Sequence, residues 1–289
     1  MLRPVKSTSS AIPYSEGSAR PWWLWPNVLS LDAPLVAVVW QEAFGRAAGV
    51  DLSWDQRGLL ALCAWLAYCG DRLLDARRLT GPVDSARHEF ARVHAKPLRW
   101  LWGLGFVGAT VLALKLSALE LKMGVLLLAG VIGYFVLQHH ARWRLTAGRW
   151  KELMVGVGFG LGTLFFVGLQ TPLSGALISL GLAWMGLCAL NCLLIAGWDR
   201  DRDAAIGQPS MARYWPGLRG GMSWGLGGVV GLAILAGGFD PDWWPMALVT
   251  VLAALGLWEL ARRPVAAGAE ANRVWADAIL LTPVLWLLM

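Results

Sequence analysis

Between Leu153 and Trp198 the chain runs for 46 residues without one charged side chain. A single helical crossing of a bilayer needs about 20 predominantly apolar residues, so this stretch is long enough for two crossings. Only 15% of all residues are charged and the mean hydropathy is +0.53, whereas a soluble domain carries about 25% charged residues. The sequence therefore predicts an integral membrane protein with several helices. Its apolar runs are continuous rather than alternating, which excludes an outer-membrane barrel.

Charge and cysteine content exclude further classes. The formal net charge is +6, which in a soluble protein would suggest nucleic acid. In a membrane protein it reflects the excess of Lys and Arg in cytoplasmic connections, so we expect membrane lipid and no nucleic acid among the partners. Neither zinc-type spacing nor a disulfide framework is present among the four cysteines, Cys63, Cys69, Cys188 and Cys192.

The chain divides into two parts. Residues 1–20 are rich in Ser, Pro and Ala and contain no apolar core of a signal peptide, so we expect a flexible N-terminal tail. Residues 21–289 are expected to form a single membrane domain, which the chain enters through an interfacial anchor of Trp22, Trp23 and Trp25.

Nine apolar segments follow this anchor. They predict an all-α fold, a polytopic membrane protein with nine transmembrane helices. The first segment is weak, because Gln41, Glu42 and Arg46 interrupt it. The segments span about 33–50, 58–76, 98–116, 122–138, 152–169, 173–198, 220–239, 243–260 and 274–289.

The distribution of Lys and Arg predicts how these helices are oriented. With nine crossings, 21 of the 25 basic residues lie on the side of the N-terminus and four lie on the other side. This asymmetry indicates a protein of the cytoplasmic (inner) membrane with a cytoplasmic N-terminus and an extracytoplasmic C-terminus. Connections on the basic side are long and the others are short. We therefore expect four helical hairpins that turn on the outer side, followed by a ninth helix.

Glycine-rich stretches within two segments predict close helix packing. Small residues four apart let membrane helices approach one another. The glycines concerned are Gly156, Gly158, Gly160 and Gly162 in one segment, and Gly221, Gly225, Gly227, Gly228 and Gly231 in another.

Two pairs of aspartates end apolar segments. Asp71 and Asp75 lie at the end of the second segment, and Asp199 and Asp203 lie at the end of the sixth. In each pair the residues are four apart, so they share one face of a helix and repel each other. A counter-charge between the pairs is therefore expected, and Mg²⁺ that bridges to substrate phosphates is the natural candidate. The alternative is a solvated helix end in which the aspartates pair with neighbouring arginines, namely Arg72, Arg77, Arg200 and Arg202.

These motifs resemble those of the UbiA superfamily of intramembrane prenyltransferases, and the resemblance covers about residues 28–289. The family's NxxxDxxxD motif after helix two corresponds to Ala-xxx-Asp-xxx-Asp at 67–75. Its second motif, DRxxD followed by IGxxS, corresponds to 199–203 and 206–210. The sequence Leu-Asp-Ala-Pro at 31–34 resembles the family's LDRP-type entry to helix one.

The resemblance implies nine helices around a central cavity and the transfer of a prenyl chain from a prenyl diphosphate to a hydrophobic acceptor, aromatic or lipid. It implies Mg²⁺ as cofactor. The metal ligands and catalytic residues that it implies are Asp71, Asp75, Asp199 and Asp203. Basic and polar residues at the same predicted membrane edge are candidates for contacts to the substrate: Arg72, Arg142, Arg144, Lys151, Asn191 and Arg200.

Two positions depart from the family pattern. The asparagine of the first motif is replaced by Ala67. The acidic residue about seven before the second motif is replaced by Cys192, with Asn191 beside it. The alternative function is therefore a catalytically altered or silent membrane protein on the same scaffold. A transporter is a further alternative, although its polar residues would lie in the middle of the membrane rather than at one edge.

Glu42 and Asp277 are acidic residues inside predicted spans. Ionisable residues there are functional candidates by default. Glu42 and Asp277 each have an arginine four residues away, Arg46 and Arg273 respectively. The sequence leaves open whether these acids form ion pairs with those arginines or line the cavity.

Overall fold

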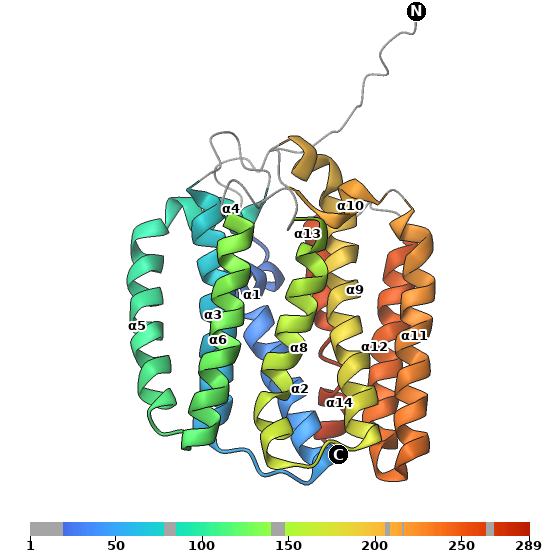
Figure 1. Ribbon diagram of the computed structural model, residues 1–289. Helices are drawn as coiled ribbons and strands as arrows, with labels where there is room; N and C mark the ends of the chain where they lie inside the picture. Colours follow the sequence, from blue (N-terminus) through green and yellow to red (C-terminus); the bar gives the residue numbers. More distant parts are fainter. Residues whose placement is uncertain (1–19, 78–84, 140–147, 206–208, 216, 264–268) are drawn as a thin grey trace, which may run out of the picture.

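The computed structural model describes residues 20–77, 85–139, 148–205, 209–215, 217–263 and 269–289. Within these ranges the fold is all-α, as predicted, with thirteen α-helices and three short 3₁₀ helices. The long helices run side by side in one bundle (Figure 1). The expected flexible tail, residues 1–20, lies outside the described residues except for Arg20.

Eight long helices account for the first eight apolar segments. They are α2 (Asp32–Ala48), α3 (Trp54–Ala76), α5 (Ala95–Ala113), α6 (Ala118–His139), α8 (Lys151–Gln170), α9 (Gly175–Ala205), α11 (Leu218–Phe239) and α12 (Trp244–Arg262). The shorter elements are η1 (Trp22–Leu24), α1 (Trp25–Val28), α4 (Ala86–Val93), η2 (Gly148–Trp150), α10 (Met211–Tyr214), η3 (Pro241–Trp243), α13 (Ala269–Ile279) and α14 (Val284–Leu287).

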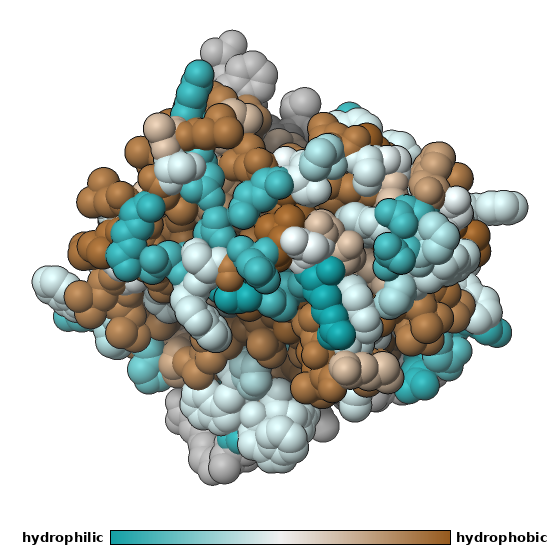
Figure 2. All heavy atoms as spheres, turned by 90° about the horizontal axis from the view of Figure 1, so that it is seen from below, coloured by the Kyte–Doolittle hydropathy of each residue, from teal (hydrophilic) through white to brown (hydrophobic). Residues whose placement is uncertain are grey.

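Five helical stretches are long and apolar enough to cross a membrane, and a sixth is counted if α1 and α2, which meet at 81°, form one broken span. The five are Ala118–Gln138, Gly148–Gln170, Gly175–Asp201, Gly220–Phe239 and Pro241–Arg262. The outer surface suits such a location. Leu126 and Val136 of α6 are more than half exposed, and hydrophobic side chains form much of the outline seen from below (Figure 2). The chain is therefore an integral membrane protein with several apolar helices.

Four tight turns join the long helices at one end of the bundle. The hairpins are α2–α3, α5–α6, α8–α9 and α11–α12, and their turns lie at the lower end of Figure 1, where the chain also ends. These are the four hairpins expected from the connection lengths.

The first hairpin shows how the sequence sets such a turn. α2 ends at Gly49, whose φ of 65° is left-handed and suits glycine. α3 then begins with a capping box, in which the Ser53 hydroxyl accepts from the Gln56 N–H and the Gln56 side chain accepts from the Ser53 N–H. Arg57 braces the hairpin by donating to both carboxylate oxygens of Glu42, at 2.6 and 2.9 Å.

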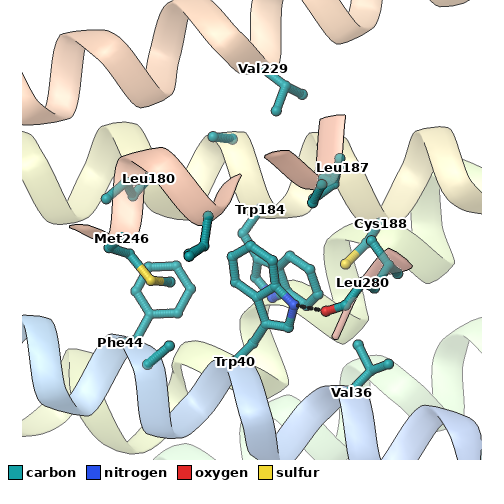
Figure 3. Close-up of a cluster of buried hydrophobic side chains, with 14 of the residues drawn as sticks. Val36, Trp40, Phe44, Leu180, Trp184, Leu187, Cys188, Val229, Met246 and Leu280 are labelled. Atoms are coloured by element: carbon teal, nitrogen blue, oxygen red, sulfur yellow. Dashed lines mark hydrogen bonds between the residues drawn. The ribbon is translucent and has the colours of Figure 1, made fainter. Parts of the chain in front are cut away.

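The last apolar segment is not the single helix that we expected over 274–289. It is divided into α13 and α14 by a turn at residues 280–283. Pro283 explains the break, because proline lacks an N–H and restricts the residue before it. The Leu280 carbonyl accepts a hydrogen bond from the Trp40 indole at 2.6 Å (Figure 3), and Thr282 donates to the Val249 carbonyl at 3.1 Å. The last segment is thereby tied to α2 and α12.

The centre of the bundle is a dry aromatic core. Trp40 of α2 stacks on Trp184 of α9 with ring centroids 3.8 Å apart, and neither residue is exposed (Figure 3). Such stacked pairs stabilise beyond their burial, by about 0.5–1.5 kcal/mol. The stack fixes α2 against α9, and these two helices carry several residues of the site described below.

Close packing explains some of the glycines. A Cβ at Gly156 would lie 2.4 Å from the Ala189 backbone nitrogen, and one at Gly160 would lie 2.5 Å from Met185. A Cβ at Gly225 would lie 2.8 Å from Leu190. The predicted close approach of helices is therefore confirmed at these three positions. It is wrong at five others, where no described atom lies within 4 Å of the added Cβ: Gly158, Gly221, Gly227, Gly228 and Gly231.

Candidate functional site

Both aspartate pairs lie at the same end of the bundle. α3 and α9 each begin at a hairpin turn and run to the opposite end. Asp71 and Asp75 occupy the last turns of α3, and Asp199 and Asp203 occupy the last turns of α9. The end of the bundle that carries them, at the top of Figure 1, is called the mouth below.

Lys151 connects the two pairs. It is the first residue of α8, and its ammonium is close enough to Asp71 and Asp75 for Coulombic interaction with both. It also interacts with Asp203. Three of the four predicted carboxylates, which lie up to 132 positions apart in the chain, are thus within Coulombic range of one ammonium.

Asp199 has different partners. It is 7% exposed and bonds the guanidinium of Arg273 on α13, which is 1% exposed. Arg87 of α4 lies 3.8 Å from its second oxygen. Asp199 thus pairs with two arginines that are remote from it in the sequence.

Asp203 is outside the apolar spans but is still partly buried. Burial raises the pKa of this carboxyl to about 6, while the Lys151 ammonium acts in the opposite direction. Asp203 is therefore ionised at neutral pH and takes up a proton in mildly acidic conditions.

The predicted substrate contacts are dispersed. Arg72 is buried and donates to the Asn27 and Val28 carbonyls, which ties α1 to α3. Arg200 is exposed on α9. Arg142 and Arg144 lie outside the described residues.

A small cavity lies deeper in the bundle. Its volume is about 30 Å³. It is bounded by α2, α3, α8, α9 and α13, and it borders the aromatic core, where Val36, Cys188 and Leu280 are drawn in Figure 3. The lining residues are Asp32, Ala33, Val36, Tyr68, Val155, Gly156, Phe159, Cys188, Asn191, Cys192, Asp277 and Leu280.

The cavity and the mouth are neighbours. Cys192 lines the cavity and is close enough to both Lys151 and Asp277 for Coulombic interaction. Asn191 precedes Asp199 by eight residues on the same helix, about 12 Å at the helical rise. Cys192, the position where the family pattern has an acid, therefore lies at the cavity and near Lys151 of the mouth.

Buried polar side chains gather at this cavity. The Asn191 amide donates to Asp277 at 3.0 Å, and the Asn27 amide donates to Asp32 at 2.6 Å. The carboxyls of Asp32 and Asp277 are in hydrogen-bonding contact. Asp277 therefore lines the cavity, which was one of the two alternatives left open by the sequence.

Glu42 forms an ion pair, but not with the arginine that we considered. Its partner is Arg57 of the neighbouring helix. Arg46 instead donates to the Trp286 carbonyl at 2.9 Å and lies over the Trp286 ring. Glu42 is not among the cavity-lining residues.

Sequence reasoning missed the helix that covers the mouth. α4 lies in a stretch that we took for a basic connection, although Ala86, Phe90 and Val93 have helical spacing. The Glu270 carboxylate of α13 accepts from the Ala86 N–H at 2.6 Å and so caps α4. On the other side of α4, Glu89 pairs with Arg20 at 3.1 Å. α4 thus brings Arg87 to Asp199.

By themselves, the described residues offer no three-ligand site for a metal ion. In the described part of the chain, no three His, Cys, Asp or Glu side chains are grouped closely enough to hold one. Mg²⁺ commonly needs only one or two protein carboxylates together with substrate phosphates. Asp71, Asp75 and Asp203 meet that requirement in chemistry and number, whereas the Asp199 carboxylate already bonds Arg273.

No family model, no curated protein and no solved structure matches this chain.

Proposed function

We propose that this protein is an intramembrane prenyltransferase of the UbiA type. It takes a prenyl diphosphate at the mouth and transfers the prenyl chain to a hydrophobic acceptor, aromatic or lipid. The observation that carries the proposal is that Asp71, Asp75 and Asp203, from two helices, all lie within Coulombic range of Lys151 at one end of the bundle.

In this proposal one or two of Asp71, Asp75 and Asp203 would hold Mg²⁺ together with substrate phosphates, and Asp199 would join them only by exchanging its arginine partners. Bound Mg²⁺ would neutralise the diphosphate leaving group. Lys151 donates to phosphate oxygens as a compact cation. Arg142, Arg144 and Arg200 add positive charge at the same edge, and Asn191 contacts the substrate from the cavity.

We further propose that the protein lies in the inner membrane and crosses it nine times. Its N-terminus is then in the cytoplasm. To six apolar spans, with α1 and α2 counted as one broken span, this arrangement adds α3, α5 and the α13–α14 pair. α3 has 23 residues, or about 35 Å at the helical rise, and its charges lie toward its ends. In this arrangement 21 of the 25 basic residues of the sequence belong to the tail and to the connections on the side of the N-terminus, and this asymmetry supports the orientation.

A catalytically silent protein on the same scaffold is the second candidate. Two observations favour it: Asp199 is held by two arginines, and Ala67 stands where the family has a ligand. In that case the aspartates are salt-bridged helix ends.

Binding of a non-reactive donor separates the two candidates. Farnesyl thiodiphosphate is titrated calorimetrically into the purified full-length protein with and without Mg²⁺. We expect saturable, Mg²⁺-dependent binding that is lost in Asp71→Asn. It should be retained in the control Asp242→Asn, an exposed aspartate at the opposite end. Absence of binding by the wild type with Mg²⁺ present would overturn the enzymatic proposal and leave the silent scaffold.

A further inference from the structure

The outer face of α5 is exposed and apolar along the length of the helix. α5 stands at the edge of the bundle (Figure 1). Its inner face packs on α3, where the Trp102 indole donates to the Leu66 carbonyl at 2.9 Å. On the other side, five apolar residues at spacings of three and four are each more than half exposed, and they form what is called the α5 stripe below: Trp100, Leu104, Val107, Val111 and Leu114.

Two basic residues lie at the mouth end of this stripe. Lys96 and Arg99 are exposed, and Lys96 precedes Arg99 by three residues and Trp100 by four, so the three side chains lie on one side of the helix. The sequence contains no Asp or Glu between Glu89 and Glu120. In the described part of the chain, no ion pair involves Lys96 or Arg99. Two positive charges are therefore left without a counter-charge from the protein.

The other end of α5 is different. Lys115, just beyond the stripe, donates to the Asp55 carboxylate of α3 at 2.9 Å. The basic residue at that end is thus paired within the protein, whereas the mouth end is suited to a ligand that brings negative charge.

The length and composition of the stripe suit a lipid. Trp100 and Leu114 are 14 residues apart, or about 21 Å at the helical rise. One leaflet contributes about 15 Å of hydrocarbon, half of the bilayer core, so an acyl chain can lie along the stripe. Tryptophan favours the level of the headgroups, which puts Lys96 and Arg99 beside the lipid phosphate. Arginine suits this role, because its guanidinium can donate two hydrogen bonds to one phosphate.

Charge determines the class of lipid. A zwitterionic headgroup carries its own ammonium, which would meet two unpaired cations. A headgroup with net negative charge meets no such repulsion. A soluble phosphate would use the two cations but leave the apolar stripe uncovered.

We propose that the mouth end of α5 binds an anionic phospholipid. Its phosphate lies at Lys96 and Arg99, and one acyl chain lies along the α5 stripe. This lipid is neither the prenyl donor nor the acceptor. The proposal rests on the proposed crossing of the membrane by α5, but not on prenyl transfer.

The test compares two lipids that differ only in the headgroup. Dioleoylphosphatidylglycerol or dioleoylphosphatidylcholine is titrated into the full-length protein in a neutral detergent, and native mass spectrometry measures the dissociation constant of each. One basic residue near a lipid surface favours an anionic lipid about fivefold. We therefore expect the phosphatidylglycerol to bind about 25-fold more tightly. Glycerol 1-phosphate in large excess should not displace it.

Variants locate this preference. Combining Lys96→Gln with Arg99→Gln should reduce the preference to less than threefold. The matched control combines Lys115→Gln with Lys122→Gln, which removes the same charge at the opposite end, and it should keep the full preference. All four side chains are exposed. The single variant Lys96→Gln, with an expected loss of about fivefold, serves if the double variant does not fold.

Several results would overturn the proposal. They are equal affinities of the wild type for the two lipids, a preference that survives without Lys96 and Arg99, and an equal loss in the control, which would assign the preference to overall charge. Displacement by glycerol 1-phosphate would replace the lipid by a soluble phosphate. Mg²⁺-dependent binding of farnesyl thiodiphosphate is measured separately and should persist in every variant, so failure of the lipid site and failure of the proposed function are distinguishable.

Discussion

The two aspartate pairs have the same spacing in the sequence, but the structure gives them different surroundings. Asp71 and Asp75 face Lys151 at the mouth. In the second pair, Asp203 shares that lysine, while Asp199, one turn earlier, is held by arginines from α4 and α13. The comparison shows that an identical motif acquires its chemistry from residues that only the tertiary structure brings near. Asp199 joins α9 to α4 and α13 through its ion pairs with Arg87 and Arg273. The other three aspartates interact with Lys151.

The largest expected effect tests whether the ion pairs of Asp199 stabilise the packing of α4 and α13 against α9. Asp199→Asn leaves Arg273 buried without its counter-charge, and breaking such a pair costs about 3–5 kcal/mol. We therefore expect a clear fall in the midpoint of thermal unfolding, followed by tryptophan fluorescence in detergent. Asp201→Asn, on the exposed side of the same helix turn, is the control and should unfold like the wild type. Equal midpoints for both variants would remove the distinction between Asp199 and its neighbours.

The next effect tests the shared cation. Lys151→Met removes the charge that faces three carboxylates, so diphosphate affinity should fall about ten- to hundredfold, as for the loss of a charged hydrogen bond. Calorimetry with farnesyl thiodiphosphate measures it. Lys122→Met, exposed at the opposite end, should leave the affinity unchanged. A similar loss in both variants would mean that general surface charge, rather than Lys151, attracts the ligand.

A smaller effect concerns pH. Burial raises the pKa of Asp203 to about 6, so protons compete with Mg²⁺ below that value and diphosphate affinity should decline as pH falls from 7 to 5. The unfolded carboxyl titrates near 3.9. The folded state therefore binds the extra proton between about pH 4 and 6, and this group's contribution to stability declines as pH rises through that window. Asp203→Asn should remove both trends, whereas persistence of both would assign them to another group.

The smallest expected effect concerns Ala67, one turn before Asp71 on the same face of α3. Ala67→Asn restores the family's neutral ligand and should raise transfer of a radiolabelled prenyl group up to tenfold, or leave it unchanged, since the carboxylates supply the charge. Cys63→Asn, exposed one turn earlier, is the control. A drop in activity confined to Ala67→Asn would indicate that the first motif is packed for alanine rather than open to a ligand.

The helices could be predicted because the information is local. Continuous apolar runs and polar breaks such as Gln170-Thr171-Pro172 mark where α8 and α9 begin and end within a few residues. Pro283 also marks a helix break locally, but we did not predict the break because the apolar run continues through this residue.

The candidate site was predicted only in part. The sequence identified the aspartates and Lys151, but the Arg273–Asp199 bond joins residues 74 positions apart, and the Asp32–Asp277 contact joins 245. No local pattern encodes such pairings, because they depend on which helix faces pack together. Asn191 was expected at the substrate, and its hydrogen bond to Asp277 could not be read from its neighbours.

The position of α13 in the chain has a consequence for how the molecule is made. α13 follows all eight long helices in order of synthesis, yet it carries Arg273, which neutralises Asp199, and Asp277, which closes the cavity wall. Before α13 is synthesised, Asp199 can pair with Arg87 but not with Arg273, and the cavity lacks the part of its wall that Asp277 forms. When α13 joins the eight long helices, it therefore both neutralises a buried charge and adds Asp277 to the cavity wall.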